Sequence, residues 1–134
     1  MIELLIKIFF IAFFINLLYE LLHSILYETC LKAPPKRYVY LILKGAVFDG
    51  LAISLIYFFT YLIFKTQNTF ENYLQLLLFS FISLLFAYYW EIYSLKKGKW
   101  EYAKTMPLIF GVGLTPLVQL SLTGIFSIYL TFNF

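Results

Sequence analysis

Four long apolar stretches take up almost the whole chain and constrain its fold more than any other feature. A helix that spans a bilayer needs roughly 20 consecutive apolar residues. Runs of this length cover residues 2–25, 38–64, 73–93 and 106–132. Only three short connections separate them, so no room remains between the helices for a domain outside the membrane. We therefore predict an all-α polytopic membrane protein in which residues 1–134 form a single transmembrane domain, a bundle of four helices.

The composition points to the same class. Of the 134 residues, 63% are hydrophobic and 13% are charged, whereas soluble domains carry about 25% charged residues. The first apolar run lacks a positively charged start and is too long for a cleaved signal peptide, so we expect it to remain as the first helix. The single cysteine, Cys30, excludes an internal disulfide, and we expect it to have a packing role.

Basic residues gather in two of the three connections. Residues 26–37 and 94–105 hold seven of the ten lysines and arginines, and basic loops face the cytoplasm in most membrane proteins. We therefore predict a multi-pass protein of the bacterial inner (cytoplasmic) membrane with both termini and residues 65–72 outward. The basic loops are expected to bind anionic lipid head groups, with a phosphate-bearing substrate as an alternative ligand. Nucleic acid is not expected, because the basic residues are few and lie close to the membrane.

Several ionisable side chains lie inside these apolar runs, among them Glu20, Lys44, Asp49 and Glu91. Charges at such depth are costly and usually mark a pathway, a pocket or a partner. Lys44 is expected to reach the head groups, with pairing to Asp49 or Glu20 as the alternative. Asp49 lies near the bilayer midplane and cannot reach water. Glu91 lies at a helix C-terminus, where an anion is disfavoured, so we expect it to be protonated, paired with a basic neighbour, or functional.

The first helix carries a polar face. Asn16, Glu20, His23 and Tyr27 are spaced four, three and four residues apart, which places them on one side of a helix. Glu20 and His23 can share a proton there, and the alternative is a stripe of hydrogen bonds between helices. The Glu-x-x-His spacing also occurs in metal-binding bundles, but these need a second copy of the motif and the chain has one histidine. We therefore predict no metal and no cofactor.

The last run is interrupted by glycine and proline. Pro107 suits the first turn of a helix, and Pro116 is expected to kink the helix farther along. Within this helix Gly111, Thr115 and Gln119 would share one face at a spacing of four residues. A kink that serves only helix packing is the alternative interpretation.

The chain also shows a faint internal repeat. Glu20 and Glu91 each follow an aromatic residue near the same end of the first and third helices. An offset close to seventy residues places Asp49 opposite Leu120, beside Gln119. This pattern suggests two hairpin repeats with a shared pocket between them, where Gln119 would hydrogen-bond a ligand or Asp49.

One set of residues combines polar groups in the membrane with a Gly, Trp and Pro pattern: Asn16, Glu20, Tyr27, Asp49, Glu91, Gly98-x-Trp100-x-Tyr102, Met106-Pro107, and Gly113-Leu114-x-Pro116-x-x-Gln119. This set resembles a family of small bacterial four-helix membrane proteins over most of the chain. The portion from Glu91 to Tyr102 is also similar to helix ends of carotenoid-modifying membrane proteins, the heterodimer-type lycopene cyclases and the carotenoid hydratases. That resemblance implies a polyene or isoprenoid substrate. The chain lacks the Pro-x-Glu-Glu signature of the cyclases.

The leading hypothesis is a membrane-embedded enzyme that acts on an isoprenoid, carotenoid-like or other apolar lipid by acid/base chemistry, as an isomerase, cyclase or hydratase. Burial in a low dielectric favours the protonated form of a carboxyl group, as an acid catalyst requires. The candidate catalytic residues are Glu20, His23, Asp49 and Glu91. The candidate substrate-binding residues are Asn16, Tyr27, Trp90, Trp100, Tyr102 and Gln119, whose aromatic members can stabilise a developing cation.

Two other classes of function remain open on the sequence alone. In a small proton- or cation-coupled transporter the same acids would bind the cation, and a homodimer would be needed to enclose a pathway. In a structural or assembly subunit the polar residues would hold the helices against a partner. The expected partners are membrane lipids in every case and a lipid or isoprenoid substrate in the first.

Overall fold

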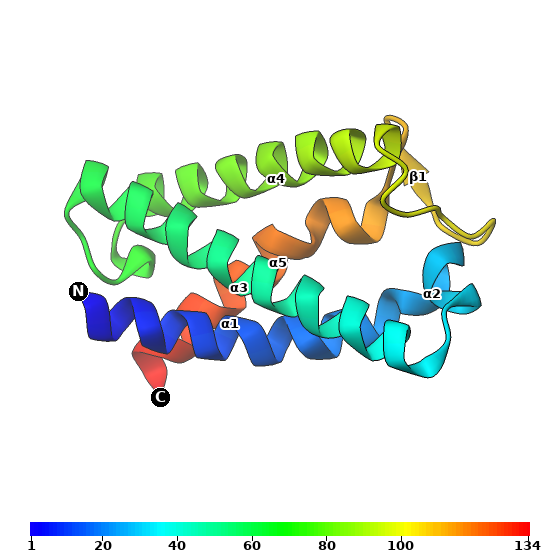
Figure 1. Cartoon of the computed structure of the whole chain (residues 1–134). Helices are drawn as coiled ribbons and strands as arrows, with labels where there is room; N and C mark the ends of the chain where they lie inside the picture. The colour runs from blue at the N-terminus through cyan, green and yellow to red at the C-terminus, as the bar shows by residue number, and fades with distance from the viewer.

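The computed structural model describes residues 1–134, and four long helices dominate it (Figure 1). These helices are α1 (Ile2–His23), α3 (Pro35–Phe64), α4 (Tyr73–Lys96) and α5 (Leu114–Asn133). Each of them is long and apolar enough to cross a membrane. The prediction of an all-α protein with four membrane-spanning helices is therefore confirmed.

Short elements lie at the two ends of the bundle. The chain termini and the 3-10 helix η2 (Thr69–Glu71) lie at one end, here called the terminal end. The other end, here called the basic end, holds the 3-10 helix η1 (Ser24–Leu26), helix α2 (Glu28–Lys32) and the two-stranded hairpin β1 (Leu108–Ile109) and β2 (Val112–Gly113) (Figure 1). Both basic connections therefore lie at the same end of the molecule.

The predicted bounds of the first three helices are close to the observed ones. Helix α3 begins at Pro35, three residues earlier than expected, because the fixed φ of proline suits the first helical turn. It ends at Phe64, and the next residue, Lys65, adopts the left-handed conformation with φ of 59°. Asn72 caps α4, since its side chain accepts hydrogen bonds from the backbone N–H groups of Leu74 and Gln75.

The start of the last helix was predicted wrongly. Helix α5 begins at Leu114 rather than at residue 106, and Pro107 lies in the connection that precedes it. Phe110 and Gly111 have φ of 50° and 82° and form the two-residue turn between β1 and β2. Paired positive φ values are typical of tight hairpin turns. Gly111 therefore does not share a helical face with Gln119.

The predicted kink at Pro116 is also wrong. Pro116 is the third residue of α5, in the first turn, where a backbone N–H would have no partner within the helix. Proline therefore costs no hydrogen bond at this position. Helix α5 starts next to the basic end and delivers Gln119 into the interior little more than one turn later.

The main apolar core occupies the terminal half of the bundle. Phe79 of α4 is fully buried and packs against Gly124 of α5, where a Cβ atom would lie 2.6 Å from the phenyl ring. Two α5 hydroxyl groups in this half bond within their own helix: Ser127 donates to the carbonyl of Thr123 and Thr131 to that of Ser127. One side-chain bond joins α1 to α5 here, from the Lys7 ammonium to the Thr131 carbonyl.

Candidate active site

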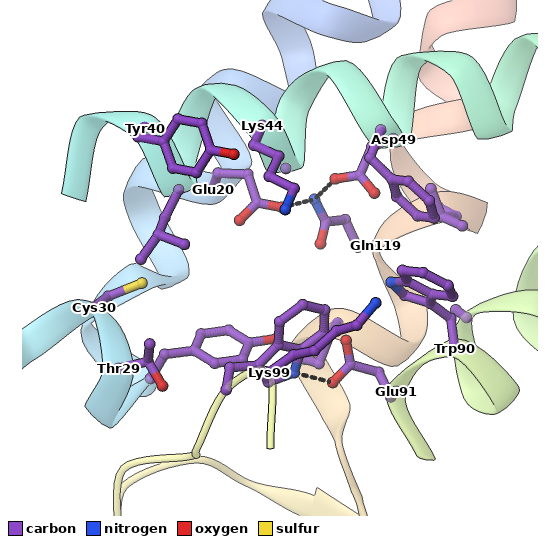
Figure 2. Close-up of a pocket in the computed structure, with 18 of the residues that line it drawn as sticks. Glu20, Thr29, Cys30, Tyr40, Lys44, Asp49, Trp90, Glu91, Lys99 and Gln119 are labelled. Carbon is purple, nitrogen blue, oxygen red and sulfur yellow. Dashed lines mark hydrogen bonds between the residues drawn. The ribbon is translucent and has the colours of Figure 1, made fainter. Parts of the chain in front are cut away.

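A cavity of about 540 Å³ lies in the basic half of the molecule (Figure 2). Its size falls within the usual range of ligand pockets, roughly 300–1,000 Å³. Helix α3 contributes the largest share of its wall, and α1, α2, α4, α5 and the connection after α4 complete it. The lining residues include Glu20, Tyr27, Cys30, Arg37, Tyr40, Lys44, Phe48, Asp49, Trp90, Glu91, Lys99, Trp100 and Gln119.

Three carboxyl groups from three different helices line this one cavity. Glu20 comes from α1, Asp49 from α3 and Glu91 from α4. Asp49 and Glu91 are 8% and 5% exposed, so neither reaches bulk water by itself. The acids that the sequence places in separate spans therefore converge on a common space.

Gln119 of α5 joins two of these acids. Its side-chain nitrogen Nε2 lies 3.0 Å from Glu20 Oε1 and 2.8 Å from Asp49 Oδ2, and 3.0 Å from Asn16 Oδ1 (Figure 2). An amide NH₂ group has two hydrogens, so three acceptors compete for them. The predicted contact between Gln119 and Asp49 is confirmed, and the Glu20 and Asp49 carboxyls meet at the same amide nitrogen.

His23 lies behind Glu20 and outside the cavity lining. Its Nε2 is 3.1 Å from Glu20 Oε2, which confirms the predicted pair. Its Nδ1 is 3.1 Å from the Thr115 hydroxyl, which itself donates to the sulfur of Met106. In the tautomer with a hydrogen on His23 Nδ1, the Thr115 hydroxyl accepts from that nitrogen and Nε2 faces Glu20 as an acceptor. The proton between His23 and Glu20 can then sit on either partner, as a relay requires.

Glu91 is held by aromatic donors. Its Oε2 accepts a hydrogen bond of 2.5 Å from the Tyr102 hydroxyl and one of 3.1 Å from Trp100 Nε1. The Tyr102 backbone pairs with that of Tyr27 in an isolated β-bridge, which ties the connection after α4 to the end of α1. No basic side chain forms an ion pair with Glu91, so the expected pairing with a basic neighbour is not found.

The two tyrosines of this bridge remain proton donors over a wide pH range. Burial raises the pKa of Tyr27 well above its usual value of 10.0. Burial and the hydrogen bond to Glu91 likewise raise the pKa of Tyr102. Tyr27 does not continue the face of helix α1 as predicted, because α1 ends at His23. Its ring still lies 5.3 Å from that of His23.

Seven of the ten candidate residues from the sequence line the cavity, and three do not. The lining residues are Glu20, Tyr27, Asp49, Trp90, Glu91, Trp100 and Gln119. Asn16, His23 and Tyr102 lie outside it, and each contacts a lining residue: Gln119, Glu20 and Glu91, respectively. These three residues therefore position the groups that a ligand would meet.

Sequence reasoning missed part of the lining. Phe48 stacks on Trp90 with ring centroids 4.7 Å apart and joins α3 to α4 on one side of the cavity. Tyr40 also lines it, as does Lys44. Lys44 is exposed and forms no ion pair with Glu20 or Asp49. Tyr40, Lys44 and Phe48 are spaced four residues apart on α3, and this spacing is the signal that could have found them.

Cys30 also lines the cavity, where a packing role was expected. Burial raises the pKa of its thiol, so the thiol stays protonated at neutral pH. A thiol in this form is a weak nucleophile. Its position still makes it a natural reporter of access to the cavity.

Comparison with known proteins adds no assignment. No protein family, no curated protein and no solved structure matches the chain. The resemblance to carotenoid-modifying proteins stays a prediction, and the chemistry of the cavity carries the functional argument.

Proposed function

We propose that the protein is a membrane-embedded enzyme that moves protons on an unsaturated, isoprenoid-type lipid bound in the cavity. One observation carries this proposal: the carboxyl groups of Glu20, Asp49 and Glu91, from three helices, face the same space. Polar groups at this depth are expensive, and side chains that served only helix packing would have no need of a space of about 540 Å³ beside them.

The geometry supplies a proton donor with a route for its replacement. A carboxylic acid of the Glu20 and Asp49 pair would add its proton to one carbon of a double bond and leave a carbocation on the other. Loss of a different proton to the carboxylate would give an isomer, and attack by a second double bond followed by proton loss would give a ring. Addition of water would give an alcohol, with the surplus proton returned to the carboxylate. His23 would pass protons to and from Glu20 through their 3.1 Å contact.

Aromatic rings support the same chemistry. Phe48, Trp90, Trp100 and Tyr27 all line the cavity. The faces of such rings attract a cation by roughly 0.5–2 kcal/mol each, without offering a nucleophile that would trap it. A developing carbocation between these rings and the carboxylates would therefore be stabilised relative to the neutral substrate.

The orientation of the protein follows from charge. The basic end, where Cys30, Arg37 and Lys99 line the cavity, would face the cytoplasm of a bacterial inner membrane. The termini and η2 would then face outward. Substrate would enter from the cytoplasmic leaflet or its surface.

The direct test supplies the purified protein in lipid nanodiscs with a panel of isoprenoid lipids in D₂O. Proton addition and removal would incorporate deuterium into the lipid, which mass spectrometry detects even when the net conversion is small. Glu20→Gln and Asp49→Asn should abolish this incorporation. Glu3→Gln is the matched control, since Glu3 is exposed at the start of α1 and far along that helix from Glu20.

The variants separate catalysis from folding. Each must retain the thermal stability and the monodisperse elution of the original protein to count. An inert panel with a well-folded protein, or deuterium incorporation that Glu20→Gln and Asp49→Asn leave unchanged, would refute the enzyme proposal.

A proton- or cation-coupled transporter is the second candidate, favoured by free acceptors on the cavity wall. The carbonyl oxygen of Gln119 and one oxygen of Glu91 have no protein partner and face the cavity (Figure 2). Oxygen atoms of this kind can coordinate a cation. Flux into proteoliposomes that Asp49→Asn abolishes, with no chemical change to any lipid, would favour this candidate over the enzyme.

A further inference from the structure

The cavity is lined by charges of both signs that differ in exposure. Asp49 and Glu91 are buried and Glu20 is partly exposed, whereas three cationic side chains of the lining, here called the mouth, are exposed: Arg37, Lys44 and Lys99. Arg37 and Lys44 come from α3, and Lys99 comes from the connection after α4. Two walls of the cavity therefore contribute positive charge to the same mouth.

These three cations have no carboxylate partner and no hydrogen-bond acceptor within the protein. The ion pairs of the structure are His23 with Glu20 and Lys32 with Glu28, and none of the three cations is among the side-chain hydrogen-bond donors. The Lys99 ammonium lies 4.4 Å from the centroid of the Trp90 ring and 4.9 Å from that of Tyr93. These contacts hold it at the mouth and leave its hydrogens free for an anion.

Other basic residues of the same connections do not line the cavity. Lys36 is next to Arg37 in the first turn of α3, and Lys96 closes α4, yet neither belongs to the lining. Membrane orientation requires basic residues at this end of the protein, but it does not require any of them to line the cavity. The mouth is therefore a feature that general attraction to lipid head groups does not explain.

We propose that the mouth binds a phosphate or diphosphate head group and that the substrate is an amphiphile with such a group on an apolar chain. The buried acids repel an anion while the mouth attracts it, so the charge distribution orients the ligand with its head outward. The apolar chain of the ligand then extends inward past Leu41 and Phe48 towards Asp49. This inference rests on the proposed function, for which it names the substrate class.

The two tryptophans of the chain are Trp90 and Trp100, and both line the cavity. Intrinsic fluorescence therefore reports on its occupancy without a label. The experiment titrates purified protein in a nonionic detergent with farnesyl diphosphate, farnesol and inorganic pyrophosphate. Arg37→Gln and Lys44→Gln are the test variants, since Lys99 contacts Trp90 and would alter the signal directly.

We expect farnesyl diphosphate to bind more tightly than either farnesol or pyrophosphate, with an affinity that falls as salt rises. Each test variant should weaken diphosphate binding by about tenfold, the effect of losing one charge-assisted hydrogen bond. Farnesol binding should not change. Lys36→Gln and Lys96→Gln are matched controls of equal charge change and should leave both affinities unchanged.

Three outcomes would overturn the inference. These are equal affinity for farnesol and farnesyl diphosphate, equal losses in the test and control variants, and pyrophosphate binding as tight as that of farnesyl diphosphate. The last would mean a site for free phosphate rather than for a lipid head group.

The proposed function fails in a different way. Glu20→Gln should abolish deuterium incorporation and retain the preference for the diphosphate. If the preference is seen but no lipid is turned over, the head-group site stands and the enzyme proposal falls.

Discussion

The terminal half and the basic half of the bundle differ in how the polar side chains of α5 bond. In the terminal half, Ser127 and Thr131 donate to carbonyl groups of their own helix. In the basic half, Gln119 bonds side chains of two other helices. A hydroxyl that bonds its own helix leaves the surface free for close packing, whereas a long side chain that bonds across helices keeps them apart.

This difference explains how a small membrane bundle can hold a cavity. Association of helices in a bilayer depends mainly on packing and on hydrogen bonds between helices. Here the terminal half supplies the packing, with Phe79 seated on Gly124. The basic half is then free to hold a hollow, polar site. The two halves therefore should respond differently to the same kind of substitution.

The largest contrast is expected for matched phenylalanine truncations. Phe79→Ala removes a fully buried ring from the terminal half and should cost about 3 kcal/mol of stability. Phe48→Ala removes a partly exposed ring from the cavity wall and should cost less than about half as much, since no new void is created. Unfolding of the protein by SDS in mixed micelles measures both. Equal losses would mean that the basic half is packed like a core.

Loss of the shared amide donor should have the next largest effect. Gln119→Leu leaves the Glu20 and Asp49 carboxyls without their common partner, and unmade bonds to buried polar groups cost about 1–3 kcal/mol. Ser127→Ala removes a bond within one helix and should cost less than about 0.5 kcal/mol. The same unfolding assay compares them. A neutral Gln119→Leu would show that the amide is not what links the helices.

A smaller contrast is expected for added methyl groups. A Cβ atom at Gly124 would lie 2.6 Å from the Phe79 ring, which is fully buried, so Gly124→Ala should cost about 1–2 kcal/mol. At Gly45 the nearest atoms, 3.1 Å away, belong to the Glu20 carboxyl, which can shift into the cavity. Gly45→Ala should therefore leave stability nearly unchanged. If thermal unfolding shows Gly45→Ala to be the more damaging variant, the cavity does not offer that freedom.

The smallest effect concerns the reactivity of Cys30. Burial raises the pKa of its thiol above 9.0, so alkylation by a small maleimide should be slower than for free cysteine at pH 8 and should accelerate as pH rises past 9. Introducing Ser83→Cys into a Cys30→Ser protein places a thiol in the terminal half, where Ser83 is fully buried. That thiol should not react. Alkylation of the thiol at position 83, or no alkylation of Cys30, would contradict the conclusion that the basic half holds the accessible cavity.

The sequence predicts the helices well wherever apolar length alone decides. The helix prediction is wrong for Met106–Gly113, because that segment is almost as apolar as the helix after it. Hydropathy alone cannot distinguish an apolar turn from an apolar helix. The adjacent Phe110 and Gly111, with positive φ, form a hairpin instead. The local cue for this turn was Gly111, which lies between Phe110 and Val112. A glycine with such neighbours also suits a membrane helix, so the cue does not decide between the two structures.

The candidate site is also predictable from the sequence only in part. The depth of Glu20, Asp49 and Gln119 in the membrane marks them as buried polar groups, and the structure brings them together. The cationic mouth is not predictable from sequence, because a lysine near the head groups has the same pattern whether it lines a cavity or faces lipid. Lys36 and Arg37 are neighbours in the sequence, yet only Arg37 lines the cavity.

The most direct test of the account is an experimental density map of the protein in lipid nanodiscs with farnesyl diphosphate. The account predicts an enclosed cavity with the diphosphate at Arg37 and Lys44 and an apolar chain that ends beside Glu20 and Asp49. A map in which side chains fill this space, or in which the acids point separately to water or lipid head groups, would contradict it.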